Sequence, residues 1–217
     1  ITVTVDNTFA TPYLQQPLDH GADMVLHSAT KYLGGHSDLI LGAVCTNSDE
    51  WAEKLRFQIK STGAAPGPMD CFLALRGTKT LHLRMEQHCD SARRLAQMLN
   101  AHAKVGLVRY PGLPSHPGHA LAQKQMSDYG GMISFELADD DMDKALAILD
   151  AVEVFTLAES LGGVESLIEH PASMTHASIP AKERRKIGLT DSLIRLSVGV
   201  ESFDDLQDDL DRALRQV

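Results

Sequence analysis

The stretch MVLHSATKYLGGHSD, residues 24–38, decides how the chain is organised. Its apolar beginning, MVLH, predicts a buried strand, which ends in two hydroxyl residues, Ser28 and Thr30, and a lysine, Lys31. The Gly-Gly pair that follows predicts a tight turn. Because α/β sheets carry their ligand sites at the carboxyl ends of strands, this order of residues predicts that Lys31 lies at a binding site.

A second strand is predicted upstream, where apolar residues and threonines alternate in ITVTV, residues 1–5. This strand leads directly into Asp6. A buried carboxylate is costly unless it faces a cation or several hydrogen-bond donors, so we expect Asp6 to have such partners. The two strand ends together would present a carboxylate, two hydroxyls and a lysine.

The first 80 residues continue in an α/β pattern. Residues 39–46, LILGAVCT, are apolar throughout and predict a strand covered on both faces. A helix is predicted over 47–63, with Asn47 or Ser48 as its N-cap and Gly63 as its end. A longer helical stretch follows over 70–103, which Gly77 bends or divides, and we expect a domain boundary near residue 80. Its apolar stripe consists of Leu81, Met85, His88, Ala92, Leu95 and Leu99.

The remaining chain, residues 81–217, predicts a second unit of α+β type. Strands are expected at 131–137, within 154–160 and within 192–200, on the basis of short alternating or apolar runs. Helices are expected at 120–126, 141–152 and 204–217, the last with a charged, solvated face.

Composition narrows the class of protein. The net charge of −9 argues against a nucleic-acid or membrane-surface binder, since both need a basic face. The three cysteines form no C-x-x-C motif and cannot all pair, which favours a reduced, cytoplasmic setting. No apolar run approaches the roughly 18 residues of a membrane span. The chain opens inside a predicted strand without a methionine, so we expect that it is part of a longer protein.

The residues at the two strand ends match the needs of pyridoxal 5'-phosphate. A lysine can form a Schiff base with this cofactor, a carboxylate can keep its pyridine nitrogen protonated, and hydroxyls can bind its phosphate. Lys31, Asp6, Ser28 and Thr30 supply these groups. No metal site is expected, because His116 and His119 form an H-x-x-H pair without a third ligand.

Four segments then carry a specific resemblance. They are VDNTFATPYLQQPLDHGADMVLHSATKYLGGHSD (5–38), YPGLPSHPGH (110–119), FTLAESLGGVESLIEHPASMTHAS (155–178) and SLIRLSVGVE (192–201). In order and content they resemble the Cys/Met-metabolism family of pyridoxal-phosphate enzymes, which includes cystathionine γ-synthases, cystathionine γ-lyases, methionine γ-lyases and cystathionine β-lyases. The resemblance implies the aspartate aminotransferase-like fold (fold type I). Residues 1–80 would be the C-terminal part of the large cofactor-binding domain, and 81–217 the C-terminal α+β domain.

The resemblance also implies roles for individual residues. Lys31 matches the lysine that holds pyridoxal phosphate covalently as a Schiff base and later acts as a base. Asp6 matches the carboxylate on the pyridine nitrogen, and Ser28 and Thr30 match the phosphate ligands. Arg195 matches the arginine that binds the α-carboxylate of the substrate, work that suits a planar bidentate donor.

Three further positions match residues near the substrate. Ser160 and Thr175 correspond to positions close to the substrate and the cofactor lysine. Glu159 corresponds to a position associated with preference for a substrate that bears a distal polar group.

The implied reaction is a γ-elimination of the transsulfuration type, in which cystathionine gives cysteine, 2-oxobutanoate and ammonia. The alternatives are γ-replacement on an activated homoserine, as in cystathionine γ-synthase, methionine γ-elimination, and another reaction on the same scaffold such as O-acetylhomoserine sulfhydrylation or β-elimination. A different class of hypothesis is an inactive fragment or binding module. The retention of Lys31, Asp6 and Arg195 together argues against it, because a module would need none of them.

The family's subunit is about twice as long as this chain, and the part without a counterpart would lie upstream. It would carry the turn that binds most of the phosphate and the tyrosine that stacks on the pyridine ring. The family resemblance further implies a homotetramer in which a neighbouring subunit completes each site.

Overall fold

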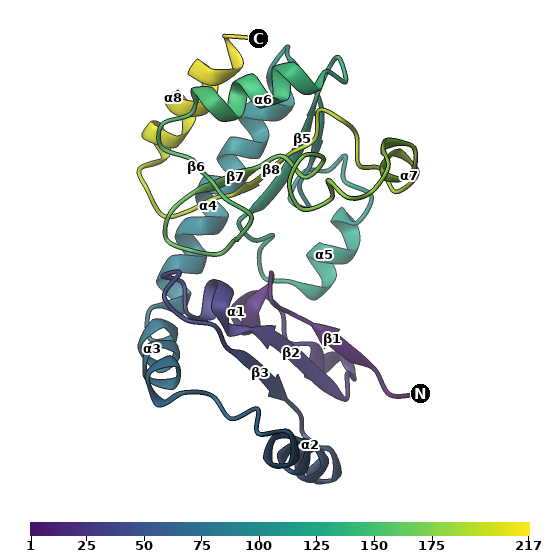
Figure 1. Ribbon diagram of the computed structural model, residues 1–217, viewed down its shortest axis with the longest axis vertical. Helices are drawn as coiled ribbons and strands as arrows, with labels where there is room; N and C mark the ends of the chain where they lie inside the picture. Colours follow the sequence, from purple (N-terminus) through teal and green to yellow (C-terminus); the bar gives the residue numbers. More distant parts are fainter.

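A computed structural model describes all 217 residues and contains two separate sheets joined by a long helix (Figure 1). The first sheet has three strands in the order β1 (Thr4–Asp6), β2 (Met24–Ser28) and β3 (Gly42–Cys45). β1 and β2 are parallel, and Asp6 pairs with Leu26, so the carboxyl ends of the two strands lie at the same edge. The connection between them contains α1 (Thr11–Leu14) and the short 3-10 helix η1 (Pro17–His20), which Gly21 ends in the left-handed conformation.

The third strand differs from the prediction in its length and in its burial. It is shorter than residues 39–46, and it runs antiparallel to β2. Its side chains are not covered on both faces: Val44 and its neighbour Leu26 are exposed, as is Ile40 just before the strand. The apolar composition predicted a covered strand, but these side chains line an open groove whose other wall includes Leu55 and Ile59.

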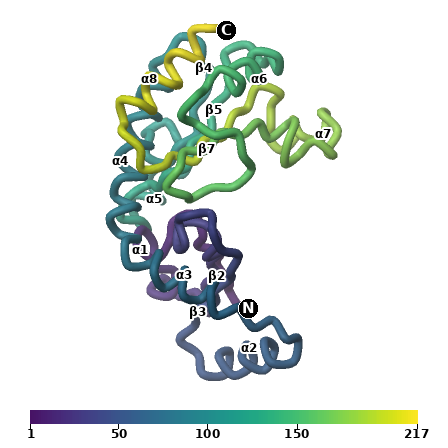
Figure 2. The backbone as a smooth tube through the Cα atoms, turned by 60° about the vertical axis from the view of Figure 1, so that its left-hand side comes forward, coloured from purple at the N-terminus to yellow at the C-terminus, as the bar shows by residue number.

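Helix α2 (Asp49–Thr62) begins and ends as its sequence predicts. The Ser48 hydroxyl caps it by accepting a hydrogen bond from the Trp51 backbone N–H, and Gly63 adopts the left-handed conformation after its last turn. No residue of α2 is buried, and in both views the helix projects at the end of the molecule opposite α8 (Phe203–Leu214) (Figures 1 and 2).

The long helical stretch is divided, but not at Gly77. α3 (Pro68–Thr78) ends and α4 (Leu81–Ala101) begins on either side of Lys79 and Thr80. Gly77 instead allows the helix backbone to lie close to the turn that follows Lys31, because a Cβ at this position would be 2.3 Å from the Gly34 carbonyl oxygen. The glycine therefore lets α3 pack directly against that turn.

The second sheet has five strands in the order β4-β5-β8-β7-β6. Their bounds are β4 (Val105–Arg109), β5 (Met132–Leu137), β6 (Thr156–Leu157), β7 (Leu167–Glu169) and β8 (Ile194–Ser197). Helices α4, α6 (Met142–Ala151) and α8 enclose the main hydrophobic core against this sheet. α5 (His119–Gln125) and α7 (Ala181–Lys186) lie outside this core. The strands β5, β6 and β8 and the helices α5, α6 and α8 confirm the predicted pattern, although β6 has only two residues, whereas β4, β7 and α7 were not predicted.

Helix α4 contributes to the main hydrophobic core and to a smaller one beside the first sheet. Its predicted apolar stripe is buried along its whole length. Leu81 and Met85, in its first half, pack in the small core beside the first sheet, and Leu95 and Leu99, in its second half, pack in the main core. The first sheet lies before residue 80 and the second after it, and the division into domains at that residue remains a prediction. None of the helices is long and apolar enough to cross a membrane.

Candidate active site

Lys31 lies in an irregular turn directly after β2. Residues Ala29–Leu33 form a single π-helical turn, η2, in which Lys31 itself has non-helical angles (φ −90°, ψ −133°). The Gly34 backbone N–H donates to the Ala29 carbonyl at 2.8 Å, and the Gly35 N–H donates to the Lys31 carbonyl at 2.8 Å, which closes the turn. Isolated π turns are frequent at functional sites. Here the turn directs one lysine out of a buried strand end.

The Lys31 amine has a defined partner. Its Nζ donates to the Ser160 Oγ at 2.9 Å, across 129 positions of sequence. Burial lowers the pKa of Lys31 from its ordinary value, and the positive charge of Arg195 lowers it further. The neutral amine, which is the form that acts as a nucleophile or base, is thus favoured relative to a surface lysine.

Asp6 lies at the carboxyl end of β1, as predicted, but its side chain is exposed rather than buried. No cation faces it. Its Oδ1 accepts a hydrogen bond from the Thr8 backbone N–H at 3.0 Å. Hydrogen bonding by the Thr8 side chain, and then by its backbone, lowers the pKa of Asp6, so the carboxylate is ionised at neutral pH.

The two predicted phosphate ligands, Ser28 and Thr30, line one groove along β2 and β3, and only Ser28 also lines the cavity that contains Lys31. Ser28 lines the same cavity as Asp6 and Lys31, and its backbone N–H donates to the Thr8 Oγ1 at 2.8 Å. Thr30 does not line this cavity. Its Oγ1 accepts a hydrogen bond from the Leu41 backbone N–H at 3.1 Å, and it lies in the groove along β2 and β3.

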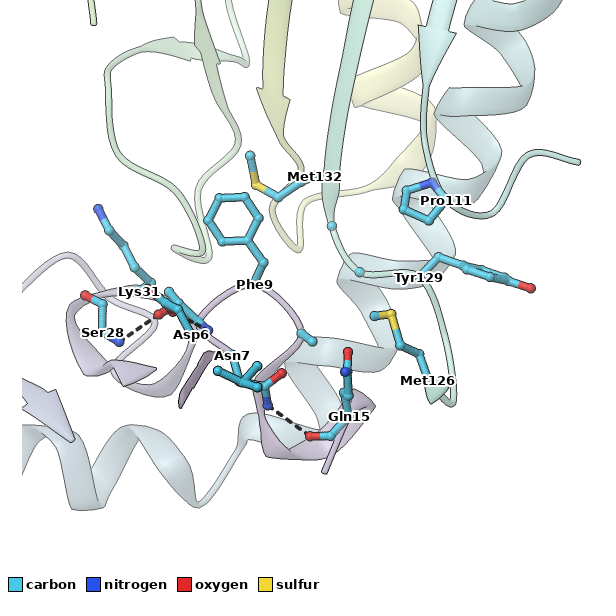
Figure 3. A pocket seen from close by; sticks show the side chains of 15 residues that line it. Asp6, Asn7, Phe9, Gln15, Ser28, Lys31, Pro111, Met126, Tyr129 and Met132 are labelled. Atoms are coloured by element: carbon cyan, nitrogen blue, oxygen red, sulfur yellow. Dashed lines mark hydrogen bonds between the residues drawn. The ribbon is translucent and has the colours of Figure 1, made fainter. Parts of the chain in front are cut away.

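The cavity has a volume of about 670 Å³, within the range of small-molecule and cofactor sites. The lining residues Asp6, Ser28 and Lys31 come from the first sheet and the turn after β2, while Met126 and Met132 come from the second part of the chain (Figure 3). A cavity of this size with an ionised carboxylate, a hydroxyl and a lysine of lowered pKa fits pyridoxal phosphate. The donor set thus agrees with the chemistry that the sequence predicts.

Arg195 is joined to Lys31 through Ser160. Arg195 lies on β8, and its Nη2 donates to the carbonyl oxygens of Glu159 at 2.7 Å and Ser160 at 3.1 Å. Ser160 therefore contacts both residues: its hydroxyl accepts a hydrogen bond from Lys31, and its backbone carbonyl accepts one from Arg195. The structure brings these three predicted site residues together from η2, β8 and the loop after β6.

Glu159 and Thr175 have exposed side chains beside this group. The Glu159 backbone contacts Arg195, while the Thr175 Oγ1 donates to the Glu169 Oε1 at 2.9 Å. Glu169 also forms an ion pair with Arg195 and was missed by the sequence analysis. The only signal that could identify it is its place opposite Arg195 across β7 and β8, which requires the strand register.

Comparison with known proteins gives consistent results. The chain is 55% identical over 213 residues to a cystathionine gamma-lyase of Dictyostelium discoideum and 60% identical over 215 residues to a cystathionine beta-lyase of Lactococcus lactis subsp. cremoris. Each match covers 98% of this chain. The structure also matches that of cystathionine gamma synthase from Xanthomonas oryzae pv. oryzae, solved in complex with aminoacrylate and cysteine. That match has a TM-score of 0.95 and 49% identity over 99% of this chain.

The chain spans only 55% of the length of each of these three proteins. At 49% identity and this TM-score, its fold is that of the corresponding part of the synthase, with both sheets included. The family model described as "Cys/Met metabolism PLP-dependent enzyme" matches residues 1–215. The chain therefore belongs to the Cys/Met metabolism family of pyridoxal-phosphate-dependent enzymes.

Proposed function

We propose that the protein catalyses γ-elimination on sulfur amino acids and converts cystathionine and water into cysteine, 2-oxobutanoate and ammonia. The observation that carries the proposal is the chain of contacts from Lys31 through Ser160 to Arg195. These contacts place the Lys31 amine and the Arg195 guanidinium against the same residue, Ser160. An amine that can exchange a proton and a donor that can fix a carboxylate are both needed for chemistry at the α-carbon of an amino acid.

Lys31 holds the cofactor and moves protons in this proposal. Pyridoxal phosphate, when bound, supplies an electron-withdrawing ring that accepts the charge left at the substrate α-carbon. The Lys31 Nζ takes the α proton, and its lowered pKa keeps part of the amine neutral for this purpose. The Ser160 hydroxyl orients the amine by accepting one of its hydrogens.

Two charged residues position the reactants. The Asp6 carboxylate, with its lowered pKa, stays ionised and holds a proton on the pyridine nitrogen. Arg195 binds the substrate α-carboxylate, and Ser28 and Thr30 serve the phosphate. Thr30 lies outside the cavity that contains Lys31, but it shares the groove along β2 and β3 with Ser28, so both could contact one phosphate there.

Glu159 and Thr175 complete the proposed substrate site. The exposed Glu159 side chain, next to Ser160, suits a substrate with a distal ammonium group such as cystathionine. The same feature serves γ-replacement, and the likeness to a cystathionine gamma synthase favours that reaction as a second candidate. Methionine lacks a distal charge and fits less well. β-elimination, which the name of the Lactococcus relative indicates for that protein, acts on the same substrate.

The site would be completed by an upstream part of the protein and by a neighbouring subunit of a homotetramer. The upstream part is supported by relatives of nearly twice this length, and the neighbouring subunit is suggested by the family resemblance. All three cysteines are free, which agrees with a reduced, cytoplasmic setting.

The test uses the full-length protein with cystathionine, and its products are identified by mass spectrometry. We expect 2-oxobutanoate and cysteine from the wild type and from Lys186→Ala, a control at an exposed lysine of α7, but neither product from Lys31→Ala. Pyruvate with homocysteine would identify β-elimination. Cystathionine formed from cysteine and an activated homoserine, without 2-oxobutanoate, would identify the synthase. A protein that takes up no cofactor and forms no product would be an inactive fragment or binding module.

A further inference from the structure

Glu169 and Arg195 form a buried cross-strand pair at the edge of the candidate site. Glu169 on β7 lies directly opposite Arg195 on β8 in the antiparallel register. The Glu169 side chain is 2% exposed and that of Arg195 is 21% exposed, and the two form an ion pair. A carboxylate this deeply buried needs more than one partner. The second is the Thr175 Oγ1, which donates to the other carboxylate oxygen, Oε1, at 2.9 Å.

The contacts of Arg195 are concentrated on one nitrogen. Nη2 contacts Glu169 and donates to the carbonyl oxygens of Glu159 and Ser160. No hydrogen bond from Nε or Nη1 to another protein group is present. Nη2 is thus anchored, while the N–H groups of Nη1 and of Nε stay free. Both pairs of parallel donors on a guanidinium include Nη2, so the donors left for an anion are the two N–H groups of Nη1 and, separately, the N–H of Nε.

The anchoring is more than the stability of the sheet requires. A buried ion pair is often no more stabilising than well-packed apolar residues, because both charges lose their hydration. The other cross-strand pair of the same sheet, Arg109 with Glu136, is more exposed, at 38% and 15%, and its arginine has no effect on the pKa of Lys31. The buried Glu169 carboxylate instead fixes the Arg195 guanidinium, whose positive charge lowers the pKa of Lys31.

We propose that Glu169 is a positioning residue for substrate binding. It holds Arg195 by Nη2, with Thr175 holding Glu169 in turn, so that the free N–H groups of Nη1 are aligned for the α-carboxylate of the amino acid before it arrives. The inference rests on the proposed function, because it takes Arg195 as the carboxylate-binding residue. It adds that the alignment depends on a residue that need not touch the substrate.

The experiment compares Glu169→Gln and Glu169→Ala with the wild type in the full-length, cofactor-loaded protein. Glu136→Gln is the matched control, since it removes the carboxylate of the other cross-strand pair. We measure kcat and KM for cystathionine, the absorbance of the bound cofactor, and inhibition by propanoate and by propanamide, which lacks the carboxylate. For Glu169→Ala we expect KM and the propanoate inhibition constant to rise about tenfold, because a displaced binding group loses its alignment.

The remaining results discriminate a positioning role from a structural one. Glu169→Gln keeps an acceptor for Nη2 and the size of the side chain, so we expect partial rescue, with KM about threefold above the wild type. The kcat, the cofactor absorbance and the propanamide inhibition should stay within about twofold in all variants, since only the carboxylate contact is affected. Equal propanoate inhibition in the wild type and both Glu169 variants would overturn the inference, as would a fall in kcat with KM unchanged.

The propanoate measurement also separates this inference from the proposed function. If the wild type binds propanoate in preference to propanamide but does not convert cystathionine, the proposed reaction is wrong and Glu169 is still tested. If cystathionine is converted normally by Glu169→Ala, the reaction stands and the positioning role is wrong.

Discussion

Gly162 is the position where a single methyl group should disturb the candidate site most directly. It follows Ser160 and Leu161 and has a φ of +77°, in the left-handed region. A Cβ added there would lie 2.7 Å from the Tyr32 backbone nitrogen and 3.0 Å from the Tyr32 ring. Tyr32 is fully buried and adjoins Lys31. Gly162→Ala would therefore push the loop with Ser160 away from the turn that bears Lys31.

The expected magnitude has two parts. The left-handed conformation costs a residue with a Cβ about 1–2 kcal/mol. Overpacking in a closely packed region costs about 1–3 kcal/mol more. The total loss in the free energy of unfolding is thus about 2–5 kcal/mol. Gly188→Ala is the matched control, because Gly188 has a φ of +78° but a Cβ there would meet only the Arg109 Nη2, at 4.0 Å. That control should lose only the first part, about 1–2 kcal/mol.

The assay is urea unfolding of the full-length protein followed by circular dichroism, together with titration of pyridoxal phosphate. Gly162→Ala should unfold at lower urea than Gly188→Ala and should bind the cofactor more weakly, while Gly188→Ala should bind it like the wild type. Equal unfolding midpoints for the two variants would refute the reasoning, because the Tyr32 contact would then contribute nothing.

Three further predictions concern Lys31. Replacing Ser160 by alanine removes the hydroxyl that accepts from the Lys31 Nζ, worth about 1 kcal/mol, so kcat/KM should fall about fivefold with the fold intact; an unchanged kcat/KM would show that the contact does not orient the amine. In the cofactor-free protein, acylation of Lys31 followed by mass spectrometry should reach half its maximal rate below pH 10.5, the ordinary lysine pKa, because burial lowers the pKa of Lys31. Arg195→Gln should raise that midpoint by removing a positive charge, and no change would contradict the assigned cause. At pH values between the lowered pKa of folded Lys31 and its ordinary value of 10.5, Lys31 is protonated in the unfolded chain but largely neutral in the folded one. The contribution of Lys31 to the free energy of unfolding should therefore increase as pH rises through this interval.

Sequence patterns predicted the elements whose local signals are strong. The apolar run before Lys31 forms β2, Ser48 and Gly63 bound α2, and the 3.6-residue stripe of α4 is buried. In each case the deciding interactions are within a few residues of one another, so the pattern and the structure agree.

The features that were missed depend on distant parts of the chain. β7 has only three residues and acquires its identity by pairing with β6 and β8. The role of Glu169 depends on that register, and Gly77 packs on a turn more than forty positions away. The expectation that Asp6 is buried was wrong: its side chain is exposed, and its carboxylate accepts a hydrogen bond from Thr8, two residues away. Such relations are set by tertiary packing, which a local pattern does not contain.

The most direct test of the account is to locate the attachment site of the cofactor. The full-length protein is loaded with pyridoxal phosphate, reduced with borohydride, digested and mapped by mass spectrometry. The account predicts a phosphopyridoxyl group on the peptide that contains Lys31 and on no other lysine peptide. Attachment at a different lysine, or stoichiometric uptake by Lys31→Ala with that group on another residue, would contradict it.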